Sequence, residues 1–271
     1  MEFGAVSGEA LLVVAVLVAI VAFFYSNLGL GGGQLYVPIM DFFFVSLFMV
    51  DIVPLSLCFA FVTMITATYT HSRKGLVDFK LGGLLALAGL LGVVGGVAFT
   101  STAREEFVKG GFAALLLVVA TKMMHDIYRQ TREPDTSPTS FTWNQRLGGM
   151  GVSILTGFLV GSFGIGGGVV SVPLVIYVFK LHTRKAIGTS ALMGAILTPA
   201  ALLAYLLNQS IAGDVTIDFD LALVLTPIVF VFAFVGSRWG LEKLRTRIVK
   251  TIFTGGVYLA ASEMMYSLLF T

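Results

Sequence analysis

Long apolar runs, bounded by charged residues, glycine or proline, follow one another along the whole chain. They are longer than the strands of a membrane barrel and lack a two-residue alternation, so helices are expected. The runs lie near residues 8–27, 34–48, 52–70, 79–101 and 107–125, and then near 147–163, 169–180, 186–207, 219–238 and 248–269. The pattern predicts an all-α protein with five helical segments in each half.

Two glycine-rich stretches interrupt this pattern at equivalent places. The stretch Gly29–Pro38 reads GLGGGQLYVP and the stretch Gly164–Pro173 reads GIGGGVVSVP, with an offset of 164 − 29 = 135. Weaker matches, such as Asp78-Phe79 with Asp218-Phe219, extend the similarity through both halves. An internal duplication follows, with a first repeat at 1–130, a linker at 131–146 and a second repeat at 147–271, all within one membrane domain. The alternative is that the glycines only form tight turns between helices.

The distribution of lysine and arginine predicts how the two repeats are oriented. The segment after each glycine motif is short for a full span, which needs ~20 residues, so it crosses steeply or folds back as a re-entrant hairpin. With an odd number of segments per half, one side of the membrane collects 15 of the 17 Lys and Arg residues; with four continuous crossings per half the split is 7 to 10. Because cytoplasmic loops hold the excess, the odd count is preferred, and a duplicated odd unit must be inverted. We therefore expect 8 to 10 transmembrane segments, two of them broken by glycine or re-entrant, with both termini outside the cytoplasm.

Small residues recur at four-residue spacing within some of the runs. Examples are Ala88, Gly92 and Gly96 in the fourth run, and Gly157 and Gly161 in the sixth. Small side chains let helix backbones approach closely in lipid, where hydrophobic burial does not hold helices together. These positions predict close helix–helix contacts.

Composition restricts the class of protein further. The chain of 271 residues is 57% hydrophobic and 12% charged, with a mean hydropathy of +0.94, which describes an integral membrane protein. The start lacks a basic cluster, so no cleaved signal peptide is expected. The single cysteine, Cys58, excludes an internal disulfide and a cysteine-based metal site. No metal, cofactor or enzyme motif is recognised, and the net charge of +2 does not indicate nucleic-acid binding.

The two motifs of an inverted pair should meet near the middle of the membrane, where irregular backbone is tolerated because it lines a cavity. Bare backbone N–H groups and the positive end of a following helix favour an anion there. Neutral side chains around the same point would add donors without a buried cation; the alternative for each hydroxyl is a helix-to-helix hydrogen bond. The predicted substrate-binding residues are Gly31, Gly32, Gly33, Gln34, Ser56, Gly166, Gly167, Gly168, Ser171, Thr189 and Ser190.

Four charged residues are further candidates. Asp41 and Glu263 lie within apolar runs, where an ionisable group is costly, so each is a candidate proton carrier or member of a structural ion pair. Arg184 and Lys185 follow the second short segment and could draw an anion to the cytoplasmic mouth, although ordinary topology-setting charge explains them as well.

Taken together, the duplicated motif, the run Arg184–Ser190 (RKAIGTS) and the Gly75–Asp78 stretch before a glycine-rich helix resemble the TauE/SafE family of sulfite exporter-like membrane proteins. The first half departs from the pattern, because Val50–Ser56 (VDIVPLS) stands where the second half has Arg184–Ser190. The resemblance implies outward transport of sulfite, or of a sulfonate such as sulfoacetate, across a bacterial inner membrane.

The sequence therefore predicts a secondary transporter of a small sulfur-containing anion, working by alternating access. A carrier of another small anion, such as a carboxylate, and a membrane binding or assembly protein without transport remain alternatives. The expected partners are the anion and the lipid bilayer, and the oligomeric state stays open.

Overall fold

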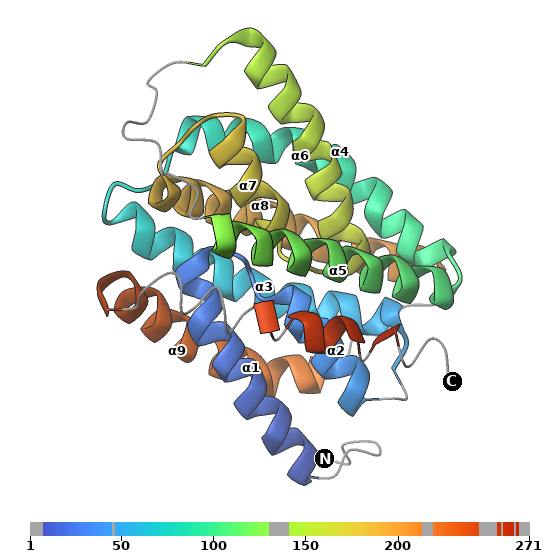
Figure 1. The fold of residues 1–271 in the computed structure, drawn as a ribbon. Coiled ribbons are helices and arrows are strands. Elements are labelled where there is room, and N and C mark those ends of the chain that lie inside the picture. Colours follow the sequence, from blue (N-terminus) through green and yellow to red (C-terminus); the bar gives the residue numbers. More distant parts are fainter. Residues whose placement is uncertain are drawn as a thin grey trace.

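A computed structural model describes residues 8–44, 47–129, 141–212 and 219–243, with the short stretches 254–255, 257–262 and 264–265 (Figure 1). The described residues are helical with short connections. Helices α1 to α5 are Gly8–Leu28, Gly33–Phe43, Met49–Ser72, Phe79–Thr102 and Glu105–Arg129; helices α6 to α9 are Trp143–Phe163, Gly168–Tyr177, Thr183–Ala212 and Phe219–Lys243. Each of the first nine predicted runs is a helix, and the tenth, near 248–269, falls largely outside the described residues.

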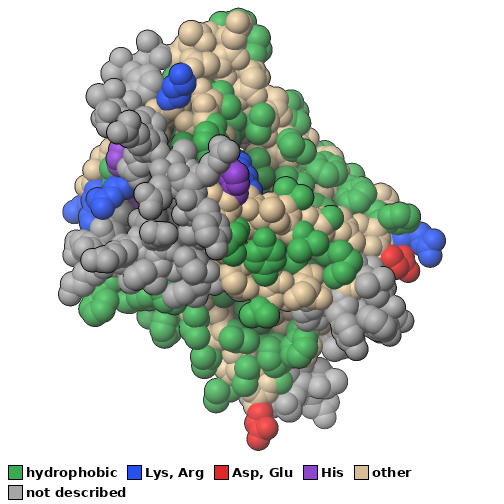
Figure 2. Space-filling view, in the orientation of Figure 1, with side chains coloured by type: hydrophobic (Ala, Val, Ile, Leu, Met, Phe, Trp, Pro, Cys, Tyr) green, Lys and Arg blue, Asp and Glu red, His purple; other side chains and the backbone are tan. Residues whose placement is uncertain are grey.

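Six of the described helices, α1, α3, α4, α6, α8 and α9, are long and apolar enough to cross a membrane. Many of their large hydrophobic side chains face outward, for example Leu91, which is 72% exposed, and Leu223, which is 75% exposed. Figure 2 shows hydrophobic side chains over much of one face, with most of the visible charged side chains toward its edges. Outward-facing apolar surface of this extent is suited to lipid, so the protein is a multi-pass membrane protein.

The predicted small-residue contacts between helices are confirmed for α4 and α6. A Cβ atom added to Gly92 or Gly96 would overlap the α6 backbone, and one added to Gly157 or Gly161 would meet the α4 backbone. On the other side of the bundle, Gly236 of α9 lies against the carbonyl of Phe23 in α1 in the same way. The backbones approach closely at both places because glycine has no side chain to separate them.

The direction of neighbouring helices follows from the residues that meet. Along α3 and α8, Met64 lies against Gly194 and His71 lies against Gly188. Residue numbers increase along α3 where they decrease along α8, so these two helices are antiparallel. In α4 and α6, Gly89 lies beside Ser153 and Gly96 lies beside Phe158, so this pair runs parallel.

The helix starts fall into two groups. The Asp78 side chain caps α4 by accepting a hydrogen bond from the Leu81 amide, and a Thr142–Gln145 capping box closes the start of α6. In contrast, α2 and α7 have Gly32 and Gly167 as their N-caps and no side-chain cap, and α3 has none either. Asp51 lies in the first turn of α3, which begins at Met49 with Phe48 as its N-cap.

Candidate functional site

The two glycine motifs meet in the interior of the bundle, as predicted. A Cβ atom built on Gly31 would lie 2.9 Å from the Cα of Gly166, and one built on Gly166 would lie 2.9 Å from the Cα of Gly31. Gly31 and Gly166 are equivalent residues of the two repeats, since 31 + 135 = 166. The two backbones therefore touch at matching positions.

The contacts on either side of this point are reciprocal. Gly33 packs against the carbonyl oxygen of Gly164, and its equivalent, Gly168, packs against the carbonyl oxygen of Gly29, the equivalent of Gly164. In both cases an added Cβ atom would overlap the carbonyl of the other motif. Reciprocal contact of equivalent residues is the pattern that a local two-fold axis produces.

The glycines are required by conformation as well as by space. Gly29, Gly31 and Gly32 have φ values of 61°, 82° and 89°, and the equivalent Gly164, Gly166 and Gly167 have 65°, 72° and 82°. Residues with a Cβ atom avoid this left-handed region, whereas glycine enters it without strain. Each motif uses this turn to start a new helix in the protein interior.

Helices α2 and α7 therefore direct their N-termini into the place where the motifs meet. Gly32, Gly33, Gly167 and Gly168 are all buried, and no side chain caps either helix. The first N–H groups of a helix have no partner within it and carry the positive end of the helix dipole. Uncapped helix starts are a common place for anions to bind in proteins, and here two buried ones lie at one point.

Three of the predicted hydroxyl residues form hydrogen bonds within the protein. The Ser56 hydroxyl donates to the Gly164 carbonyl at 3.0 Å, and the Ser171 hydroxyl donates to the Gly167 carbonyl at 2.9 Å. The Thr189 hydroxyl accepts a hydrogen bond from the Asp78 amide at 3.0 Å. Ser56 and Thr189 thus connect separate segments, which is the structural role considered as the alternative for such residues.

Two other predicted residues are buried without a hydrogen-bond partner. The Gln34 side chain, in the first turn of α2, is 1% exposed, and neither its Oε1 nor its Nε2 atom is hydrogen-bonded. The fully buried Ser190 hydroxyl of α8 also has no partner. Buried polar atoms are nearly always hydrogen-bonded in folded proteins, so these two side chains are available to a bound molecule.

The first of the charged candidates, Asp41, is buried and has an ion-pair partner. Asp41 forms an ion pair with Lys109 of α5 at 2.9 Å, and Lys109 also contacts Glu105 at 3.1 Å. The Asp41 carboxylate, for which the sequence suggested no partner, is therefore part of a three-residue ion network that joins α2 to α5. Glu263, the second proposed proton carrier, lies outside the described residues.

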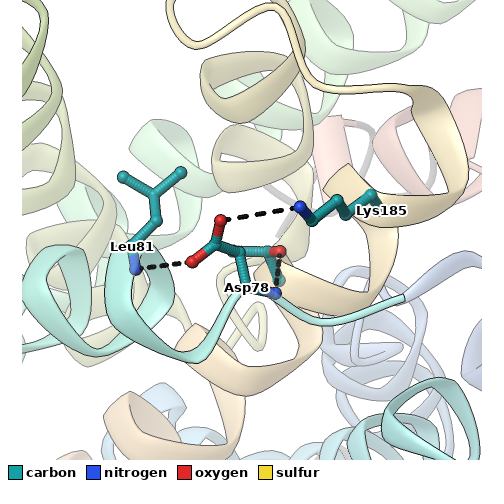
Figure 3. Close-up of polar contacts among 4 residues, drawn as sticks. Asp78, Leu81 and Lys185 are labelled. Carbon is teal, nitrogen blue, oxygen red and sulfur yellow. Dashed lines mark hydrogen bonds and ion pairs between the residues drawn. The ribbon is translucent and has the colours of Figure 1, made fainter. Parts of the chain in front are cut away.

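Lys185 joins the starts of α4 and α8. Its Nζ atom lies 3.7 Å from one Asp78 carboxylate oxygen, while the other oxygen accepts the hydrogen bond from Leu81 (Figure 3). The neighbouring Arg184 is exposed, and its backbone amide donates to a ring nitrogen of His182 at 3.4 Å. Lys185 thus has a structural contact, while Arg184 faces the surroundings of the protein.

Sequence reasoning missed Lys109 as the partner of Asp41. With an odd number of segments per half, Lys109 lies at the extracytoplasmic end of the fifth segment, near 107–125, and the second segment, near 34–48, leads to the same side. Both residues were thus on one side of the predicted topology, and that shared placement was the available signal. The predicted topology did not show which of the neighbouring helices would contact α2.

Comparison with known proteins places the chain in a family. The family model described as "Sulfite exporter TauE/SafE" matches residues 13–264. The chain belongs to the TauE/SafE family. The resemblance noted in the sequence is thereby confirmed over most of its length.

Curated relatives of this TauE/SafE protein carry transporter names. "Probable membrane transporter protein YunE" of Bacillus subtilis is 22% identical over 267 residues, covering 91% of this chain and 94% of the relative. A "probable membrane transporter protein" of Methanocaldococcus jannaschii is 26% identical over 195 residues, 69% of each chain. One from Xylella fastidiosa is 30% identical over 122 residues, 45% of this chain and 46% of the relative. No solved structure matches. The chain is a membrane transporter of the TauE/SafE type.

Proposed function

We propose that this protein is a secondary transporter that exports a small sulfur-containing anion, such as sulfite or a sulfonate like sulfoacetate, across the bacterial inner membrane. The observation that supports this most directly is the meeting of two buried, uncapped helix N-termini at the glycine motifs. The description of the family as sulfite exporters suggests that the anion contains sulfur. The glycine motifs supply a place for a negative charge.

The anion would be held by the N–H groups that open α2 and α7. Such groups, pointing along the helix dipole, bind oxyanions without a cationic side chain. A transporter gains from this, because a fully charged partner in a dry site binds an anion strongly and slows its release. The unpartnered Gln34 amide and Ser190 hydroxyl would complete the ligand shell. Ser56, Ser171 and Thr189 would hold the surrounding backbone in position.

The directions of the helices favour two inverted repeats. An odd number of segments per half makes α3 and α8, which are equivalent helices, run antiparallel; four continuous crossings per half would make them parallel. The antiparallel arrangement of α3 and α8 supports the first alternative. Inverted repeats around a central site provide two similar halves that can exchange conformations, which is the basis of alternating access. Both chain ends would then lie on the extracytoplasmic side.

Export of an anion needs no coupling ion. An inside-negative potential drives an anion outward with ~2.3 kcal/mol per charge per 100 mV. The ion pair of Asp41 with Lys109 is consistent with a structural role for this carboxylate. We therefore propose uniport.

Reconstituted vesicles test this function. Sulfite, sulfoacetate and acetate fluxes would be compared for the native protein, for Gly32→Ala and Gly167→Ala, and for Gly83→Ala, which has open space around it. Saturable flux of the sulfur anions, lost in the first two variants and kept in the third, is the expected result. Flux of acetate alone would assign the carrier to carboxylates. Binding without flux of any anion would contradict a transport function.

A further inference from the structure

Two hollows lie along one face of α7. Their volumes are about 110 and 310 Å³. Both are lined by Val169, Pro173 and Tyr177 of α7 and by Val119 and Lys122 of α5. The three α7 residues are four positions apart and share a helix face, which here faces α5 across a gap. We call these hollows together the α7 groove.

The α7 groove reaches from the glycine site to one end of the bundle. Val169 stands in the first turn of α7, directly after Gly168, and Tyr177 is the last residue of the helix. Their separation of eight residues corresponds to about 12 Å along a helix. Leu30 and Ile187, which flank Gly29, also line the smaller hollow. The inner end of the groove therefore lies beside the helix start that the proposed function assigns to the anion.

The walls of the α7 groove are almost entirely apolar. Val, Leu, Ile and Pro side chains form most of both linings, and Lys122 is the charged residue among them. Its Nζ atom lies 5.2 Å from the centre of the Tyr177 ring, above the ring face. Lys122 is exposed, so its ammonium group is held at the open end of the groove by an aromatic ring and is free of a carboxylate partner in both linings. A cation–π contact of an exposed lysine is weak and is readily exchanged for a contact with an anion.

We propose that the α7 groove is the access route to the glycine site, that Lys122 attracts the anionic head of the substrate, and that the apolar walls select an organic anion with a short apolar body. The substrate class is thus an alkanesulfonate-like anion in preference to inorganic sulfite. A strongly hydrated inorganic oxyanion would lose water against these walls without compensation. An alkyl chain buries apolar surface there instead. This inference rests on the proposed function only in naming the glycine site as the destination.

Binding of a series of alkanesulfonates tests the proposal independently of flux. Calorimetric titration of the full chain in lipid nanodiscs would use sulfite and methane-, ethane-, propane-, butane- and octanesulfonate. We expect affinity to rise about three- to fourfold per methylene group over the short members, then to level off as the groove fills. Equal affinity for sulfite and butanesulfonate would overturn the proposal. A rise that continues unchanged to octanesulfonate would also overturn it, because the groove would then be open to lipid and not a bounded substrate route.

Variants of Lys122 separate charge from packing. Lys122→Gln should weaken binding of every alkanesulfonate roughly five- to tenfold, and Lys122→Arg should restore most of it. Lys80→Gln, at the exposed start of α4, is the matched control and should bind as the native protein does. An unchanged affinity in Lys122→Gln would overturn the role of this residue.

A second variant fills the α7 groove with a larger side chain. Val119→Phe should remove the dependence on chain length, while Leu117→Phe, one position outside the lining of either hollow, should keep it. If vesicles carry sulfur anions but neither Lys122→Gln nor Val119→Phe alters binding, the groove proposal fails while the transport function stands. If binding follows chain length and Lys122 but no flux occurs, the transport function fails while the groove stands.

Discussion

The two halves of the protein share a backbone design and differ in the side chains placed upon it. Gly33 and Gly168 occupy equivalent positions and make the same contact with the carbonyl of the opposite motif. One position further on, Gln34 in the first half stands where the second has Val169, and Asp41 stands where the second has Ile176 (34 + 135 = 169; 41 + 135 = 176). Close backbone approach has strict requirements that both halves must meet, whereas polar groups can be supplied by one half alone.

The two halves would give a bound anion different surroundings. The start of α2 in the first half carries the buried polar side chain of Gln34, whereas α7 in the second half presents an apolar face to the α7 groove. An anion between the halves would therefore meet different surroundings on its two sides. A directional transporter can use such a difference, because the two conformations then need not bind the substrate equally well.

The largest loss of stability is expected for substitutions at Gly33 and Gly168, where the two halves make the same contact. Gly33→Ala and Gly168→Ala each place a methyl group onto a backbone carbonyl, so we expect each to lower the free energy of unfolding by about 3 kcal/mol or more. Thermal unfolding followed by size-exclusion chromatography would measure this, with Gly83→Ala as the control. A large loss for one variant and none for the other would show that the two contacts are not equivalent.

A second effect is expected where the halves differ at the site. Gln34→Met removes a buried amide without partners, so the substrate-free protein should gain about 1 to 3 kcal/mol of stability. The same change should weaken anion binding roughly tenfold, because a hydrogen-bond donor is lost. Thermal-shift measurements with and without sulfoacetate would show both the gain in stability and the weaker binding. Leu35→Met is the matched control. Loss of stability together with unchanged binding would exclude Gln34 from the site.

The ion network of the first half gives a smaller effect. Asp41→Asn leaves Lys109 with Glu105, so we expect a loss of about 1 to 2 kcal/mol in the free energy of unfolding. If Asp41 is structural, the dependence of flux on pH should be the same in this variant and in the native protein. A flux that ceases to respond to a proton gradient would instead identify Asp41 as a proton carrier.

The smallest effect concerns an equivalent pair of serines. Ser56 donates to the Gly164 carbonyl, so Ser56→Ala should cost about 1 kcal/mol of stability. The equivalent Ser190 has no partner, so Ser190→Ala should leave the stability of the substrate-free protein unchanged or slightly higher while weakening anion binding. Chemical unfolding and a binding titration on both variants would compare them. Equal stability losses would mean that the two hydroxyls play the same role.

Much of the helical architecture could be predicted from the apolar runs. Nine of them coincide with helices, because a membrane chain must satisfy its backbone hydrogen bonds within each segment. The meeting of the glycine motifs was also predictable, since the duplicated spacing implied two equivalent kinks. The contacts of individual side chains could not be predicted in the same way. The sequence suggested no partner for Asp41, and it gave Lys122 no role beyond being one of the 15 Lys and Arg residues that indicate topology. Contacts of α2 and α7 with α5 depend on how the helices pack.

The sequence by itself determined the membrane class, the helical segments, the duplicated glycine kinks and the family. These properties depend on local composition and on spacing along the chain, which determine what each segment can do in lipid. Only the tertiary structure decided which hydroxyls were used by the fold, which polar groups stayed unpaired, and where a groove opened beside α7. Those properties depend on which side chains from distant segments come together, and this is settled only when the helices pack.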